Sequence, residues 1–218
     1  MRDFGICPLV SIRAGINNES YSVKFEDKQI KQIVNQDINE AIRGFDLTSE
    51  ELSKILSIVY SNLEYYVRDA DIEEKLINKY QIGEIIYEGA FTDCTPKIGK
   101  ITKKVRYFII SNNVADLSEF ETESNYGLHS ITDNSCYKVL DVFKYNGKTL
   151  ITLLNIPIVY DEILKKLVMN IDMDLIKKSR EKFIESFDQP EVAELDEDWY
   201  ERLTFPIGMD GEGNLWKK

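Results

Sequence analysis

The chain has 218 residues, of which 43% are hydrophobic and 30% charged, proportions that are ordinary for a soluble globular protein. They exclude a wholly disordered chain and one that needs disulfides or metals to hold its core. The formal net charge of −11 argues against nucleic acid and anionic membranes as partners and favours a basic protein. Because no apolar run is long enough for a signal peptide or a membrane span, we expect a cytoplasmic protein.

The first third of the chain has helical spacing, and we expect a helical layer over about residues 26–80. Apolar residues recur on one stripe after Asp27. A capping box at residues 48–51 predicts the start of a second helix, whose apolar spacing continues to Val67. A third, shorter helix is predicted over residues 71–80, since Asp71 and the acid three residues later form an N-cap signal.

The middle of the chain changes to a period of two residues, which predicts a sheet over about residues 84–157. Its strongest signal is Asn146-Gly147 between two apolar runs, which predicts an antiparallel hairpin over residues 136–157. The elements expected before this hairpin are strands at 85–91 and 105–111, a loop between them, a short helix at 114–120 and a weak strand at 126–131.

Helical spacing returns after Pro157 and predicts helices over about residues 159–187, followed by an acidic tail at 188–218. Strands that are grouped between helical segments favour the α+β class over a doubly wound parallel sheet. We therefore expect a single α+β domain over residues 1–218, with a helical N-terminal layer, a mostly antiparallel central sheet and C-terminal helices.

Asp141 interrupts an apolar row of the predicted hairpin. A two-residue turn places it opposite Thr152 and on the same face as Tyr137, Val139 and Phe143. One interpretation is a buried structural carboxylate that is hydrogen-bonded to Thr152, because buried charges need partners. The other is a general acid whose pKa is raised by its apolar setting. The structural interpretation is favoured, because the sequence offers no second acid–base group beside it.

Cys94 and His129 are the other candidates for catalysis. His129 is the only histidine, which excludes zinc sites built on a histidine pair, and the sequence predicts neither a metal site nor a cofactor. A Cys–His nucleophile pair is conceivable, since its members need only be close in space. Cys94 lies in a predicted loop beside several bases, so we expect an accessible thiol with a lowered pKa. Cys136 begins a central strand, and we expect it to react only after unfolding.

Three weaker patterns complete the candidate sites. The isolated glycines form no phosphate-binding motif. Glu121-Thr122-Glu123 is a spaced acid pair of a kind that some transferases use, although a solvated helix end explains it more simply. The acidic stretch at residues 210–214 resembles the start of a calcium loop, but it lacks the glycine and the final ligand of that motif. We interpret it as a tight turn.

Charge is distributed unevenly along the chain. Residues 185–201 hold eight acids and no base, whereas residues 97–106 hold five bases and no acid. Such acidic density is unfavourable through self-repulsion unless cations lie close to it, so we expect the acidic segment either to bind a basic partner or to fold onto the basic loop of its own chain. The alternative is a solvated tail without a partner, since surface charge often serves only solubility. An intramolecular latch would open as salt rises. The residues expected to contact a partner are Glu194, Asp196, Glu197, Asp198, Trp199 and Tyr200.

These patterns favour a non-enzymatic, acidic protein-binding module, such as an inhibitor, an immunity-like protein or an adaptor for a basic partner. The alternatives are a small hydrolase or transferase that uses Asp141, or Cys94 with His129, and a small-ligand-binding domain.

Overall fold

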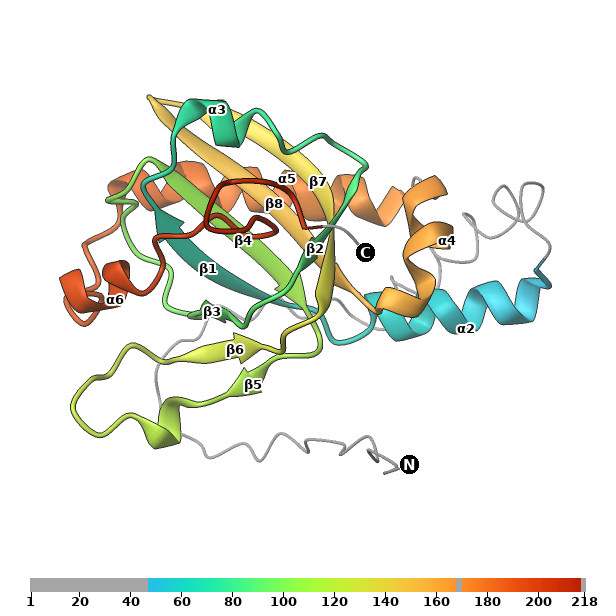
Figure 1. The fold of residues 1–218 in the computed structure, drawn as a ribbon, viewed down its shortest axis with the longest axis horizontal. Helices are drawn as coiled ribbons and strands as arrows, with labels where there is room; N and C mark the ends of the chain where they lie inside the picture. Colours follow the sequence, from blue (N-terminus) through green and yellow to red (C-terminus); the bar gives the residue numbers. More distant parts are fainter. Residues whose placement is uncertain (1–46, 168–169, 217–218) are drawn as a thin grey trace.

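The computed structural model describes residues 47–167 and 170–216. The helix predicted after Asp27, and Cys7, lie outside these residues. A five-stranded sheet forms the middle layer, with helices on one face and a three-stranded sheet on the other (Figure 1). This combination of helices and mixed sheets belongs to the α+β class, as the sequence predicts.

The five-stranded sheet has the order β1-β4-β8-β7-β2, and the three-stranded sheet has the order β3-β6-β5. Strands β4 and β8 are parallel, whereas the other pairs are antiparallel. The strands are β1 (Glu64–Ala70), β2 (Ile85–Glu88), β3 (Thr92–Cys94), β4 (Val105–Ser111), β5 (Ala115–Asp116), β6 (His129–Ile131), β7 (Ser135–Tyr145) and β8 (Lys148–Ile156).

Two apolar cores lie on the two faces of the five-stranded sheet. On one face, α2 (Ser49–Tyr60), α4 (Asp161–Lys166) and α5 (Asn170–Glu185) pack against the sheet. On the other face lie the three-stranded sheet, the short helix α3 (Glu74–Ile77) and part of the C-terminal segment. A further short helix, α6 (Glu197–Glu201), follows α5, and 3-10 turns cover Ser118–Phe120, Ile158–Tyr160 and Ser186–Asp188.

The predicted helical layer is too long. The capping box is present, since Thr48 and Glu51 bond each other's backbone, but α2 ends at Tyr60. The segment Glu64–Ala70, including Val67, is strand β1, and the last predicted helix shrinks to α3. Strand β1 is buried on both faces, so its apolar residues do not alternate and can match a helical stripe.

Strands β7 and β8 form an antiparallel pair in which Tyr145 faces Lys148 across Asn146 and Gly147. Both turn residues have positive φ, at 47° and 75°, as a two-residue type I′ turn requires. The pairing then shifts by one residue at a β-bulge between Val139 and Asp141. Val139 therefore faces Leu153, whereas the unshifted register would place it opposite Leu154, and the predicted single-face row is broken.

The helix predicted at 114–120 is also wrong. That stretch forms β5 and a 3-10 turn, and the weak strand at 126–131 is confined to His129–Ile131. The expected loop after residue 91 contains β3, which pairs with β6. Over residues 47–167 and 170–216, no helix combines the length and the apolarity that crossing a membrane requires.

Candidate functional site

Cys94 and His129 face each other on the neighbouring strands β3 and β6. The Cys94 thiol is fully buried, and burial raises its pKa. His129 Nδ1 lies 3.0 Å from the carbonyl oxygen of Gly127, and its Nε2 lies 3.9 Å from a carboxylate oxygen of Asp116. Both ring nitrogens thus face other partners. The prediction of an accessible Cys94 with a lowered pKa is wrong, because its segment is a buried strand and not a loop.

Asp141 is held in an ion pair with Arg180 of α5. Its two carboxylate oxygens accept from Arg180 Nε and NH2, both at 2.7 Å. Thr152 is opposite in the register, as predicted, but its buried Oγ1 has no hydrogen-bond partner in the described part of the chain. The predicted Asp141–Thr152 bond is therefore wrong, because Arg180 of the covering helix α5 binds both carboxylate oxygens of Asp141.

The two acids at residues 121 and 123 lie in different environments. The Glu121 carboxylate accepts from the backbone N–H groups of Gly127 and Leu128, both at 3.1 Å, and so closes a loop. Glu123 is exposed to solvent. No group of three His, Cys, Asp or Glu side chains could hold a metal ion within the residues that the structure describes.

Asp210 organises a tight turn. Its Oδ1 accepts from the backbone N–H groups of Glu212 and Asn214, at 2.9 and 2.8 Å. These bonds, first of all the one from Asn214, lower the pKa of Asp210. The stretch thus has the geometry of a side-chain-capped turn.

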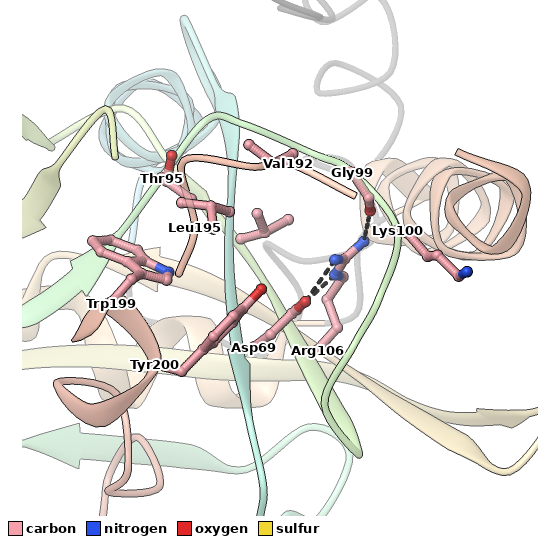
Figure 2. Close-up of a pocket in the computed structure, with 10 residues that line it drawn as sticks. Asp69, Thr95, Gly99, Lys100, Arg106, Val192, Leu195, Trp199 and Tyr200 are labelled. Atoms are coloured by element: carbon pink, nitrogen blue, oxygen red, sulfur yellow. Dashed lines mark hydrogen bonds and ion pairs between the residues drawn. The ribbon is translucent and has the colours of Figure 1, made fainter. Parts of the chain in front are cut away.

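The acidic segment folds onto the basic loop, which is the second of the two predicted arrangements (Figure 2). Lys97, Lys100 and Lys103 lie 3.7, 4.0 and 3.7 Å from glutamates of this segment. Below it, Arg106 binds both carboxylate oxygens of Asp69 at 2.6 Å and donates to the carbonyl of Gly99 at 2.8 Å. The acidic partners of the lysines are Glu194, Glu191 and Glu197, in the order of the lysines.

Most residues expected to bind a partner contact their own chain instead. Trp199 is 1% exposed and packs against Tyr126, with ring centroids 5.1 Å apart and the ring planes tilted by 37°. Asp196 caps α6 by accepting from the Trp199 N–H. Lys103 lies 4.5 Å from the ring centroid of Tyr200, whose hydroxyl accepts from Thr102. Glu194 and Glu197 pair with lysines, and Asp198 is exposed.

Two cavities lie beside this contact. The one in Figure 2 measures about 10 Å³, room for about one water molecule. The other, of about 170 Å³, is lined by Asp69, Asp71, Lys103, Tyr200 and Glu201 among others. Its buried carboxylate, Asp69, is already paired with Arg106. Neither cavity therefore offers a buried, unpaired polar group that a ligand could bind.

Arg68 is different. The structure buries three cationic side chains in its described part, namely Arg68, Arg106 and Lys138. Arg106 and Lys138 pair with Asp69 and Asp172, but Arg68 forms no ion pair within the described residues. Its NH2 donates to the carbonyl of Phe205 at 2.7 Å, and its buried Nε has no hydrogen-bond partner there. A buried charge without a counter-ion is unfavourable, so this guanidinium is suited to an anion.

Hydrogen-bonding groups surround Arg68 between the two sheets. Arg68 faces Tyr107 across β1 and β4, and the hydroxyls of Tyr107 and Tyr80 are 2.7 Å apart. Burial raises the pKa of both phenols, against the opposing charge of Arg68, so both stay protonated. Glu88 lies in the same region, since it accepts from the N–H of Gly208, next to Ile207, whose carbonyl accepts from Tyr80. We call Arg68, Tyr80, Glu88 and Tyr107 the Arg68 cluster.

Sequence analysis missed Arg68 because its segment was assigned to a helix. The available signal was a cation inside an aromatic and β-branched run, on the face of β1 that it shares with Tyr66 and Ala70. A cation in a strand buried on both faces needs a partner, and no residue type near it in the sequence identifies that partner.

No family model and no curated protein matches the sequence. Solved structures to which the chain is similar include exoenzyme S from Pseudomonas aeruginosa, in complex with human 14-3-3 protein beta and bound to Carba-NAD. That match has 14% identity and a TM-score of 0.38, and it covers 56% of this chain and 67% of that chain.

Another similar structure is ADP-ribosyltransferase HopU1 of Pseudomonas syringae, at 15% identity and a TM-score of 0.40, covering 56% of this chain and 64% of that chain. A third is C3stau2 from S. aureus with NAD, at 13% identity and a TM-score of 0.37, covering 62% and 89%. These matches contradict the prediction of an acidic protein-binding module, and we correct that prediction.

Proposed function

We propose that the chain is a transferase whose substrate is a phosphate-bearing nucleotide held by the Arg68 cluster. The observation that carries this proposal is the buried Arg68, which has no carboxylate partner in the described residues and a buried Nε without a hydrogen bond. A guanidinium binds phosphate through parallel N–H···O bonds from neighbouring nitrogens. In Arg68, one terminal nitrogen donates to the neutral carbonyl of Phe205, and the neighbouring Nε has no hydrogen-bond partner in the described residues.

The other groups of the cluster narrow the ligand class. Arg68 and Tyr80 donate to the carbonyls of Phe205 and Ile207, at 2.7 and 2.6 Å, and Glu88 accepts from the N–H of Gly208 at 2.7 Å. A ligand in this position has to offer two acceptors and one donor. Phosphate oxygens supply acceptors, and a ribose hydroxyl is a good donor to a carboxylate. A nucleotide meets all three requirements.

NAD is the first compound to test, because it combines a pyrophosphate with ribose hydroxyls. It is also a bound ligand in one similar solved structure, and Carba-NAD is bound in another. In this proposal Arg68 binds the pyrophosphate, Tyr80 donates to the same anion, and Glu88 orients a ribose hydroxyl.

Calorimetric titration of NAD into wild-type chain and into Arg68→Met tests the proposal. The matched control is Arg202→Met, which alters an arginine with a 46% exposed side chain outside the cluster. Loss of the charge-assisted bonds should weaken NAD binding at least about tenfold in Arg68→Met, and Arg202→Met should bind as wild type does. Equal NAD affinities for folded Arg68→Met and wild-type chains would overturn the proposal.

Transferase activity is measured as the release of nicotinamide from NAD in the presence of protein acceptors. Arg68→Lys keeps the positive charge and loses the planar fork, so it should retain part of the binding and lose most of the turnover. Wild-type chain that binds NAD and releases no nicotinamide with any acceptor would reduce the proposal to nucleotide binding.

We also propose that the protein works in the cytoplasm. Cys94 is a fully buried free thiol, and the cytosol keeps thiols reduced. Cell fractionation followed by immunoblotting tests this location.

A further inference from the structure

Residues 203–216 cross the Arg68 cluster, and we call them the C-terminal strap. In Figure 1 this dark-red segment lies across the face of the five-stranded sheet that is opposite α5. Leu203, Ile207 and Met209 are at most 3% exposed, and the last two belong to the core on that face. The strap therefore covers the side of the sheet from which Arg68, Tyr80 and Glu88 would meet a ligand.

The strap satisfies the cluster with backbone groups alone. The carbonyls of Phe205 and Ile207 accept from Arg68 and Tyr80. The N–H of Gly208 donates to Glu88. The strap thus presents the same order of two acceptors and one donor that the proposed nucleotide presents. These contacts bring no strap carboxylate to Arg68, whose guanidinium forms no ion pair within the described residues and whose Nε stays without a hydrogen-bond partner.

Gly208 is required for this close approach. It has φ of +82°, and a Cβ there would lie 2.9 Å from Ile86 Cδ1 on β2. Its carbonyl also accepts from the N–H of Trp216 at 3.0 Å, which closes the end of the strap. A side chain at position 208 would therefore push the strap away from the cluster without altering any group of the cluster.

The C-terminal strap is only partly buried against the rest of the protein. Phe205, Leu215 and Trp216 are 59%, 39% and 41% exposed, so much of the apolar surface that the strap carries stays in water. Opening would also expose Leu203, Ile207 and Met209, so the closed strap is the stable state and the open strap is a minor state that a ligand can select.

From these contacts we propose that the C-terminal strap is an autoinhibitory segment that competes with the nucleotide for the Arg68 cluster. This inference rests on the proposed function. Arg68 NH2, the Tyr80 hydroxyl and the Glu88 carboxylate cannot serve the strap and a nucleotide at once, so closure and binding are mutually exclusive. The apparent affinity for the nucleotide is then reduced by the fraction of molecules in which the strap is open.

Hydrogen exchange of the wild-type chain, with and without saturating NAD, tests the competition directly. Linkage requires that a ligand which displaces the strap speeds exchange in residues 205–209, where the Gly208 N–H is held by Glu88. Faster exchange in this segment supports the inference. Unchanged or slower exchange in the NAD-bound chain overturns it, and this readout needs no variant.

Gly208→Ala supplies the second test, with Gly83→Ala as its matched control. Gly83 also has positive φ, at +87°, but a Cβ there meets nothing within 4 Å. Gly208→Ala should bind NAD about tenfold more tightly than wild type, whereas Gly83→Ala should not differ from wild type. If Gly208→Ala speeds strap exchange and leaves NAD affinity unchanged while Arg68→Met abolishes binding, the inference fails and the proposed function stands. If neither wild type nor folded Gly208→Ala binds NAD or pyrophosphate, the proposed function fails and the inference falls with it.

Discussion

Arg180 on α5 holds both carboxylate oxygens of Asp141 on β7, each at 2.7 Å. The pair is asymmetric, because the side chain of Asp141 is 3% exposed and that of Arg180 is 43% exposed. If the pair is broken, water can solvate the charge of Arg180 but not the charge of Asp141, because the Asp141 carboxylate is buried. The interaction therefore fastens α5 to the hairpin.

Removal of Arg180 should accordingly be more harmful than neutralisation of Asp141. Arg180→Met leaves a buried carboxylate unpaired, at a cost of about 3 kcal/mol in the free energy of unfolding. Asp141→Asn keeps an acceptor for Arg180 and should cost about 1–2 kcal/mol. Urea unfolding measures both, with Lys177→Met as an exposed control on the same helix. A loss in Asp141→Asn that equals or exceeds the loss in Arg180→Met would show that the carboxylate is not buried as described.

The sequence predicted the parts of the fold that local rules determine. The capping box of α2 and the positive-φ turn at Asn146 depend on neighbouring residues, and both are present. The bulge before Asp141 has no such local signal, because an extra residue in one strand appears only when its partner is placed. That extra residue changed the strand partner of Val139, whereas the partner of Asp141 was missed because Arg180 lies on a helix about forty positions away.

The site was harder to predict for the same reason. Arg68 is recognisable as a buried cation only when β1 is known to be covered on both faces. Its covering groups come from residues 205–208, far along the chain. Cys94 was misplaced because a three-residue strand between polar residues has the composition of a loop.

Cys94 should be unreactive in the folded protein. Burial raises the pKa of its thiol, so no thiolate is present near neutral pH and reagents have no access to it. Timed alkylation with peptide mapping should label Cys94 and Cys136 only as fast as the chain unfolds, with little acceleration between about pH 7 and pH 9. Thr122→Cys, at an exposed position, is the positive control. Rapid labelling of Cys94 that follows a thiolate titration would contradict the buried strand.

Glu51 should make the start of α2 sensitive to acid. Hydrogen bonds from the side chain and backbone of Thr48 lower the pKa of Glu51. A group whose pKa is lowered on folding stabilises the folded state above its unfolded pKa, and this stabilisation is lost as pH falls through the folded pKa. Titration of the Glu51 carboxyl by NMR should therefore show a pKa below 4.5 in wild type and a higher value in Thr48→Ala. Ser49→Ala should leave the Glu51 titration unchanged, and an equal upward shift in both variants would argue against the cap.

Trp199, rather than the ion pairs around it, should hold the acidic segment on the basic loop. The lysine–glutamate pairs of this contact have side chains that are 21–75% exposed, and exposed pairs contribute about 0–1 kcal/mol each. The indole is 1% exposed, and truncation of a buried tryptophan costs about 3–5 kcal/mol. The latch inferred from charge alone would open in salt, whereas this packing predicts a contact that salt does not open.

Limited proteolysis near Pro190 distinguishes these two mechanisms. Trp199→Ala should make the acidic segment sensitive to protease at all salt concentrations. The combined Glu191→Gln, Glu194→Gln and Glu197→Gln variant should resist cleavage as the wild type does, because it removes the three exposed pairs and leaves the indole in place. Wild type should also resist cleavage from about 0.05 to about 0.5 M salt, although screening weakens exposed pairs over that range. Cleavage that rises with salt in the wild type, and is already high in the triple variant, would show that charge holds the segment and that the buried indole does not.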